Sequence, residues 1–310
     1  MMRRRRHAES YWETLVLCFL CFLLFLERFE GATTAPAEVA ALNAILGRWG
    51  RTASATSSPA WNISGEPCSG AANDSTDINN PNFNPGIKCV CSYDNGTTCH
   101  ITQLRVYALD VKGEIPDELQ NLTYLFNLDL SQNYLTGPVP AFIGNLTKLQ
   151  YLSFGTNALS GSIPKELGKL TSLISLSLGT NNFTGPIPLE LGNLTNLQQL
   201  YIDSCGASGE FPSTISGLSS LQILWASGNN FTGKFPDFSR TSLATLRIQG
   251  NSFDGPIPSS LSNMTKVTDL RIGDIQNGSS SLTFIRNLPS LSILILRNCR
   301  ISDIMPSDFS

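Results

Sequence analysis

Histidine and charge are both scarce in this sequence. Only His7 and His100 occur among 310 residues, and charged residues make up 15% of the chain. A serine or cysteine nucleophile needs a histidine or an equivalent base, so the sequence offers little material for such catalysis. Removal of residues 1–37, predicted below to be a signal peptide, takes away five Arg and four Glu and moves the net charge from −3 to −4. That balance excludes the basic footprint of a nucleic-acid-binding protein.

The motifs of a protein kinase are missing as well. The sequence has no glycine-rich kinase loop, no H-R-D and no D-F-G. The two "DFS" segments, which begin at Asp237 and Asp308, have serine where the D-F-G motif requires glycine. "GNNFTGKF" (228–235) has nearly the spacing of a phosphate-binding loop. However, Phe235 offers no hydroxyl for magnesium, and Pro236 follows where a helix must begin. We therefore expect no enzymatic activity, no catalytic residue, no metal and no cofactor in this chain.

The sequence has only one long apolar run, "LVLCFLCFLLFL" (15–26). It follows four arginines at positions 3–6 and precedes the small residues of "GATTAPA" (31–37), which is the order of a secretory signal peptide. A spanning helix needs about 20 apolar residues, more than this run provides; an uncleaved signal anchor is the alternative. We predict a signal peptide over residues 1–37 and entry into the secretory pathway.

In a secreted chain, cysteines can form disulfides and sequons can carry N-linked glycans. A cluster of four cysteines predicts two disulfides in any of three connectivities: Cys68, Cys89, Cys91 and Cys99. A zinc site is disfavoured because finger-like spacing is missing. Ten Asn-x-Ser/Thr sequons predict a heavily N-glycosylated surface: Asn62, Asn73, Asn95, Asn121, Asn145, Asn182, Asn193, Asn230, Asn263 and Asn277.

Leucines recur at a fixed period along most of the chain. Six leucines from Leu104 to Leu224 are 24 residues apart, Leu246 comes 22 later, and Leu270 and Leu294 resume the spacing of 24. The unit "LISLSLGTNNFTGPIPLELGNL" (173–194) has the pattern L-x-x-L-x-L-x-x-N/C-x-L, which is identified as the leucine-rich repeat. The period predicts an α/β repeat solenoid, a right-handed superhelix or horseshoe with a parallel sheet on its concave face.

Each position of the unit has its own physical task. Leu176 and Leu178 alternate with polar residues, as on a strand with one buried face. Asn181 is predicted to satisfy backbone groups at the turn, and successive repeats would stack such asparagines into a ladder. Cys205 and Cys299 occupy the ladder position, so we expect them to be small buried donors without a disulfide.

The remaining segments complete the solenoid. Residues 38–100 are predicted to form a cysteine-stapled N-terminal cap, with a helix over Glu38–Gly50, because the first strand of a stack needs a cover. Residues 101–310 are predicted to hold about nine repeats, the last one incomplete. His100 lies at the edge of the cap and is expected to be a cap or surface residue.

The cap and first repeats resemble a known family. "WNISGEPCSG", "KCVCSYDNGTTCHITQLRVYALDVKGEIP" and "NLTYLFNLDLSQNYLTGPVP" are similar to the ectodomain start of plant leucine-rich repeat receptor-like Ser/Thr kinases of the malectin-containing type. The resemblance implies ligand perception outside the plasma membrane, a possible co-receptor kinase as partner, and a downstream membrane helix and an ATP- and magnesium-dependent kinase domain that this chain lacks. A secreted binding protein similar to the polygalacturonase-inhibiting proteins is the alternative.

The predicted ligand site lies on the concave face. Small outward residues in the middle repeats give way to large ones in four adjacent repeats, and aromatic and Arg side chains dominate binding hot spots. The predicted site consists of Tyr201, Trp225, Arg247, Arg271, Asp203, Gln249 and Arg297. Trp225 beside Arg247 would offer a flat platform with a cation at its edge, suited to a peptide with an acidic group or to a protein. The alternative is a solvated sheet whose arginines pair with Asp203 and Asp269.

Overall fold

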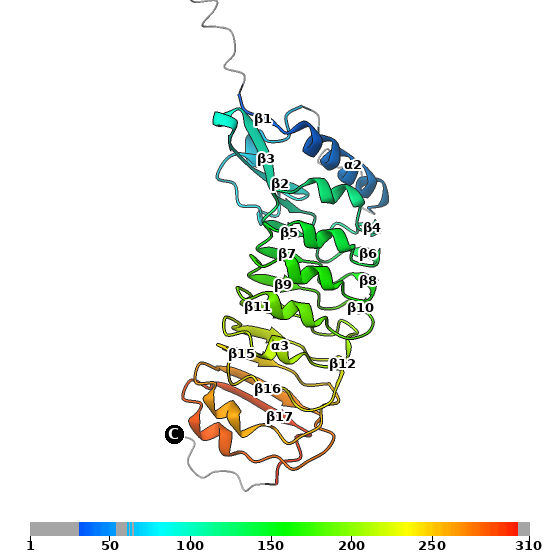
Figure 1. Ribbon diagram of the computed structural model, residues 1–310. Coiled ribbons are helices and arrows are strands. Elements are labelled where there is room, and N and C mark those ends of the chain that lie inside the picture. Colours follow the sequence, from blue (N-terminus) through cyan, green and yellow to red (C-terminus); the bar gives the residue numbers. More distant parts are fainter. Residues whose placement is uncertain (1–30, 54–60, 62, 64, 303–310) are drawn as a thin grey trace, which may run out of the picture.

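The structure, a computed structural model, describes residues 31–53, 61, 63 and 65–302. Most of the predicted signal peptide and the sequon at Asn62 lie outside the described residues. Figure 1 shows the repeats stacked into an elongated column, with the cap and helix α2 (Pro36–Thr52) at one end. The main-sheet strands run along one side of this column, and short strands run along the opposite edge.

One sheet of 11 strands runs through the whole molecule. All of its neighbouring strands are parallel except β2, which pairs antiparallel with β3. In sheet order the strands are β1 (Thr33–Thr34), β3 (Thr98–Arg105), β5 (Asn127–Asp129), β7 (Tyr151–Ser153), β9 (Ser175–Ser177), β11 (Gln199–Tyr201), β13 (Ile223–Trp225), β15 (Thr245–Arg247), β16 (Asp269–Gly273) and β17 (Ile293–Arg297), with β2 (Gly86–Tyr93) beside β3.

The opposite edge carries two smaller parallel sheets, and short helical turns link them back to the main sheet. The small sheets contain β4 (Lys112–Gly113), β6 (Tyr134–Gly137), β8 (Ala158–Gly161) and β10 (Asn182–Phe183), and then β12 (Ser208–Glu210) and β14 (Asn230–Thr232). The turns of the repeats are η4 (Asp117–Asn121), η5 (Ala141–Asn145), η6 (Lys165–Lys169), η7 (Leu189–Asn193), α3 (Ser213–Ser216), η8 (Ser259–Asn263) and η9 (Thr283–Asn287). Two further turns, η2 (Gly70–Ala72) and η3 (Asp94–Gly96), lie in the cap.

The leucine period forms the core, as predicted. Leu128, Leu152 and Leu176 are register partners on the neighbouring strands β5, β7 and β9, and each is at most 2% exposed. Phe183 adds a buried ring, and Gly185 adopts a φ of 78°, which glycine tolerates without the strain of a Cβ. The predicted solenoid with its parallel sheet is therefore confirmed.

The asparagine ladder is present and explains why the turns can be buried. The Asn181 Nδ2 donates to the backbone oxygens of Leu178 and Phe154, and its Oδ1 accepts from the Leu159 N–H. Asn133, Asn157 and Asn229 also donate to a carbonyl 27 residues earlier. Each amide thus ties its own repeat to the preceding one and satisfies backbone groups that would otherwise be buried without partners.

The two ladder cysteines are buried free thiols, as predicted. The Cys299 thiol donates to the backbone oxygen of Ile272, again 27 residues earlier. It therefore replaces the hydrogen bond that the asparagine amide nitrogen donates in the other repeats. At the Cys205 repeat a backbone group replaces the missing amide oxygen, because the Phe183 N–H donates to the Cys205 carbonyl at 2.8 Å. The small sheets break at this repeat, between β10 and β12.

Both free thiols are expected to be unreactive in the folded protein. Burial raises the pKa of the Cys205 thiol and of the Cys299 thiol to about 11. At pH 8 only about one such thiol in a thousand is a nucleophilic thiolate. Treatment with Ellman's reagent should therefore label neither cysteine in the native chain and both in denaturant; fast labelling of native protein would contradict the buried ladder positions.

The cap holds both predicted disulfides. Cys68 pairs with Cys89, and Cys91 pairs with Cys99, which selects one of the three possible connectivities. The predicted helix over Glu38–Gly50 is confirmed and extends to Pro36–Thr52. β1 lies upstream of the predicted cap start at residue 38, and the predicted cap boundary at residue 100 falls inside β3, since the cap hairpin and the first repeat share that strand.

His100 lies inside the cap, consistent with a structural task. Its Nδ1 is 2.7 Å from Glu38 Oε1, and the other oxygen of Glu38 accepts from the Ile101 N–H at 2.7 Å. The imidazole stacks on the Tyr124 ring with centroids 3.6 Å apart. These contacts dock α2 onto β3 and the first repeat.

Candidate ligand-recognition face

The outward surface of the main sheet, the face predicted to be concave, is here called the sheet face. Four predicted ligand residues lie side by side on it. Tyr201 on β11 pairs in register with Trp225 on β13, Trp225 with Arg247 on β15, and Arg247 with Arg271 on β16. Because register partners share a face of a parallel sheet, these four side chains form one continuous row across four strands.

The aromatic half of the row is held by ring contacts. Tyr201 meets Trp225 edge to face, with centroids 5.2 Å apart. The Arg247 guanidinium carbon lies 4.3 Å from the Trp225 ring centroid, over the ring. The prediction of a cation at the edge of an open platform is therefore wrong: Arg247 covers one face of Trp225 because a guanidinium gains most over the π-system.

Asp269 holds the two arginines of the row. Its carboxylate accepts from Nε and Nη2 of Arg247 and from Nε and Nη2 of Arg271, at 2.8–3.2 Å. Burial alone would raise the pKa of Asp269, but the hydrogen bonds from Arg271 and Arg247 and their charges outweigh it and hold the pKa below its ordinary value. The alternative prediction, that the arginines of the sheet form ion pairs with Asp203 and Asp269, is therefore confirmed for Asp269. Among the described residues, Asp203 forms no ion pair with an arginine.

The other predicted ligand residues lie one column from the row. Arg297 forms an ion pair of 2.8 Å with Asp274, and its side chain remains 66% exposed. Gln249 follows β15; its Oε1, like Nε1 of Trp225, is buried without a hydrogen-bond partner among the described residues. The structure thus brings the predicted residues onto one face, but whether they bind a ligand stays a prediction.

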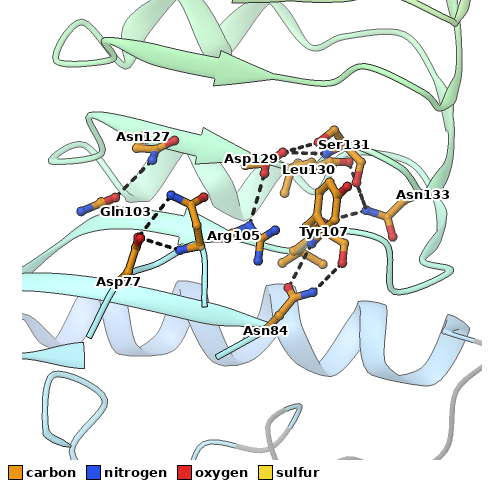
Figure 2. Close-up of polar contacts among 12 residues, drawn as sticks. Asp77, Asn84, Gln103, Arg105, Tyr107, Asn127, Asp129, Leu130, Ser131 and Asn133 are labelled. Atoms are coloured by element: carbon orange, nitrogen blue, oxygen red, sulfur yellow. Dashed lines mark hydrogen bonds and ion pairs between the residues drawn. The ribbon is translucent and has the colours of Figure 1, made fainter. Parts of the chain in front are cut away.

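A second polar cluster lies at the N-terminal end of the sheet face and was missed by sequence reasoning. Figure 2 shows Arg105 beside Asp129, whose carboxylate also accepts from the Ser131 N–H. The Arg105 Nε is 3.5 Å from Asp129 Oδ2, and its guanidinium carbon is 4.4 Å from the Tyr107 ring centroid. The same view shows Asn84 bonded to the Tyr107 backbone, a contact that joins the cap to the first repeat.

The sequons avoid the sheet face. Nine of the ten predicted sites are described, and all nine asparagines are exposed. Four end 3-10 turns, two lie on strands of the small sheets, two lie in the cap and one lies in the loop after β16. Because none belongs to a main-sheet strand, glycans at these sites would leave the row uncovered.

The described part of the chain has no group of three His, Cys, Asp or Glu residues able to hold a metal ion. Within the described ranges, no helix has the length and apolarity to cross a membrane.

A stack of short parallel strands with an asparagine ladder, which carries a row of aromatic and charged side chains on its sheet face, defines a repeat solenoid. The family model described as "Leucine-rich repeat region" matches residues 86–308. The chain belongs to the leucine-rich repeat family.

Its curated relatives are plant receptor kinases. A probable LRR receptor-like serine/threonine-protein kinase of Arabidopsis thaliana is 54% identical over 96 residues, which are 31% of this chain and 9% of that protein. A second such kinase from the same plant is 51% identical over 96 residues and is covered to the same extent. The matched segment thus spans under a tenth of the length of these relatives.

The chain is also similar to solved structures of plant receptors. The plant peptide hormone receptor RGFR1, in complex with RGF2, superposes with a TM-score of 0.61 and 33% identity, over 63% of this chain and 32% of that one. The Arabidopsis receptor kinase HAESA, in complex with the peptide hormone IDA and the co-receptor SERK1, gives a TM-score of 0.59 and 26% identity, over 81% and 44%. These two structural neighbours are plant receptors.

Proposed function

We propose that this chain is the extracellular ligand-recognition region of a plant cell-surface receptor kinase, and that its sheet face binds a peptide or a protein. Among such receptors, the cap motifs favour the type whose ectodomain also carries a malectin-like domain. The kinase would use ATP and magnesium on the far side of the membrane, and the chain described here would supply recognition. A co-receptor kinase is the second expected partner, by analogy with the HAESA complex.

The observation that carries the proposal is the ordered row Tyr201, Trp225, Arg247 and Arg271. Asp269 and the ring contacts hold these side chains before any ligand arrives, so binding would cost little side-chain entropy. The side chains of Arg247 and Arg271 still expose 27% and 26% of their surface. Exposed sequons on the other surfaces support the same face as the docking surface.

Selection of a displayed library of linear peptides on the secreted full chain tests the proposal. Binders are expected to lose about tenfold or more in affinity when Trp225→Ala or Arg247→Ala is introduced, since both residue types dominate hot spots. Tyr134→Ala is the matched control, because Tyr134 is 56% exposed on β6, away from the sheet face. A library whose binders all ignore Trp225 and Arg247 contradicts the proposal.

A further inference from the structure

The row on the sheet face does not end at Arg271. Ile295 on β17 is the register partner of Arg271, and Ile293 is the register partner of Asp269. Both isoleucines face outward and are 44% and 43% exposed, respectively. The central column therefore reads, strand by strand, aromatic, aromatic, cation, cation, aliphatic. An apolar subsite thus lies on each side of the two arginines.

The arginine pair carries an excess positive charge. Two guanidinium groups share the single carboxylate of Asp269, so the three side chains together carry a charge of about +1 at neutral pH. Each arginine uses its Nε and Nη2 on Asp269. Within the described residues, the Nη1 group of Arg247 and that of Arg271 remain available as hydrogen-bond donors. A second acceptor can therefore be held between the two arginines. A carboxylate matches both the charge and the donors.

The spacing of the row matches that of an extended peptide. Neighbouring strands are about 4.8 Å apart, so the point midway between Arg247 and Arg271 lies about 7 Å from Trp225 on one side and from Ile295 on the other. In an extended chain, alternate side chains on one face are also about 6.6–6.8 Å apart. A peptide that crosses the strands can therefore place three alternate side chains on the two apolar subsites and the arginine pair.

We propose, building on the proposed function, that the sheet face selects an extended five-residue segment with Asp or Glu at its centre and large apolar residues two positions before and two positions after it. The carboxylate binds between Arg247 and Arg271. One apolar side chain contacts Trp225 and Tyr201, and the other contacts Ile293 and Ile295. The two intervening residues point to solvent and are free to vary.

Sequencing of the peptides selected on the full chain tests this spacing. Apolar residues are expected to be enriched at two positions from the acidic residue on both sides, and not at one or three positions, where the side chain would point away from the sheet. Synthetic peptides carrying the selected segment with capped ends serve as probes in a calorimetric titration. Moving the acidic residue by one position, or changing Asp to Asn, is expected to weaken binding about tenfold.

Two substitutions assign the subsites. Ile295→Ser is expected to remove the apolar preference on one side of the acidic residue only, and Leu189→Ser is the matched control because Leu189 is 64% exposed on η7. Arg271→Ala is expected to abolish the preference for Asp over Asn, whereas Lys169→Ala, at the end of η6, leaves it unchanged. Peptides that depend on Trp225 but lack the two-position spacing would overturn this inference and leave the proposed function intact. A library without any binder to the sheet face would overturn both.

Discussion

Replacement of Asn133 by alanine is expected to lower the free energy of unfolding by about 4 kcal/mol. The Asn133 amide nitrogen donates to the backbone oxygens of Val106, Leu130 and Ser131, and its oxygen accepts from the N–H groups of Leu109 and Val111. Asn133 is only 6% exposed, so water cannot replace these bonds in the folded state. Each buried group left without a partner costs about 1–3 kcal/mol, and at least two such groups result.

Chemical denaturation of the full chain measures this effect. Asn196→Ala is the matched control, because Asn196 is exposed and its side chain makes a single hydrogen bond, to the Thr171 oxygen. A change below about 1 kcal/mol is expected there. If Asn133→Ala cost no more than this control, the ladder would not stabilise the solenoid.

A cysteine at position 133 should give an intermediate loss. A thiol can donate to one carbonyl, as Cys299 does, but it replaces the amide oxygen poorly as an acceptor. At position 205 the chain compensates by giving the Phe183 N–H a backbone carbonyl. The N–H groups of Leu109 and Val111 have only Asn133 as acceptor among the described residues, so cysteine is tolerated at some rungs of the ladder and not at this one.

Periodicity let the sequence predict the fold. A repeat of 24 residues places Leu128, Leu152 and Leu176 at equivalent positions, and stacking of similar units buries all of them together. The cap was harder to predict because it does not repeat. Its helix followed from apolar spacing, but the pairing of Cys68 with Cys89 depends on how the chain between them folds, and sequence left three pairings open.

The candidate site could be predicted as a set of positions and not as a set of contacts. Repeat register placed Tyr201, Trp225, Arg247 and Arg271 in one row, and the structure places them in the same row. Which way each side chain turns depends on competing partners. Arg247 contacts Trp225 and Asp269 at the same time, so its guanidinium lies over the ring. The spacing of residues in the sequence does not predict this side-chain orientation.

Replacement of Asp269 by asparagine is expected to lower the free energy of unfolding by about 2 kcal/mol at neutral pH. The Asp269 side chain is 9% exposed and accepts four charge-assisted hydrogen bonds, which a neutral amide cannot reproduce. Its loss would leave Arg247 facing Arg271 without the carboxylate between them. Glu190→Gln is the matched control, since Glu190 is exposed on η7, and a change within about 0.5 kcal/mol is expected for it.

The pH dependence of this loss separates a charge effect from a packing effect. Because the folded-state pKa of Asp269 lies below the ordinary value of 3.8, its carboxylate stabilises the fold fully above pH 3.8, and that contribution disappears as the pH falls through the lowered pKa. Protonated Asp269 resembles the asparagine variant in charge and shape. Denaturation curves of the two proteins, measured from pH 7 down to pH 2.5, should therefore differ at neutral pH and converge below pH 3.8. A gap that stays constant across this range would assign the effect of Asp269 to packing, and the arginine pair would then owe its order to some other contact.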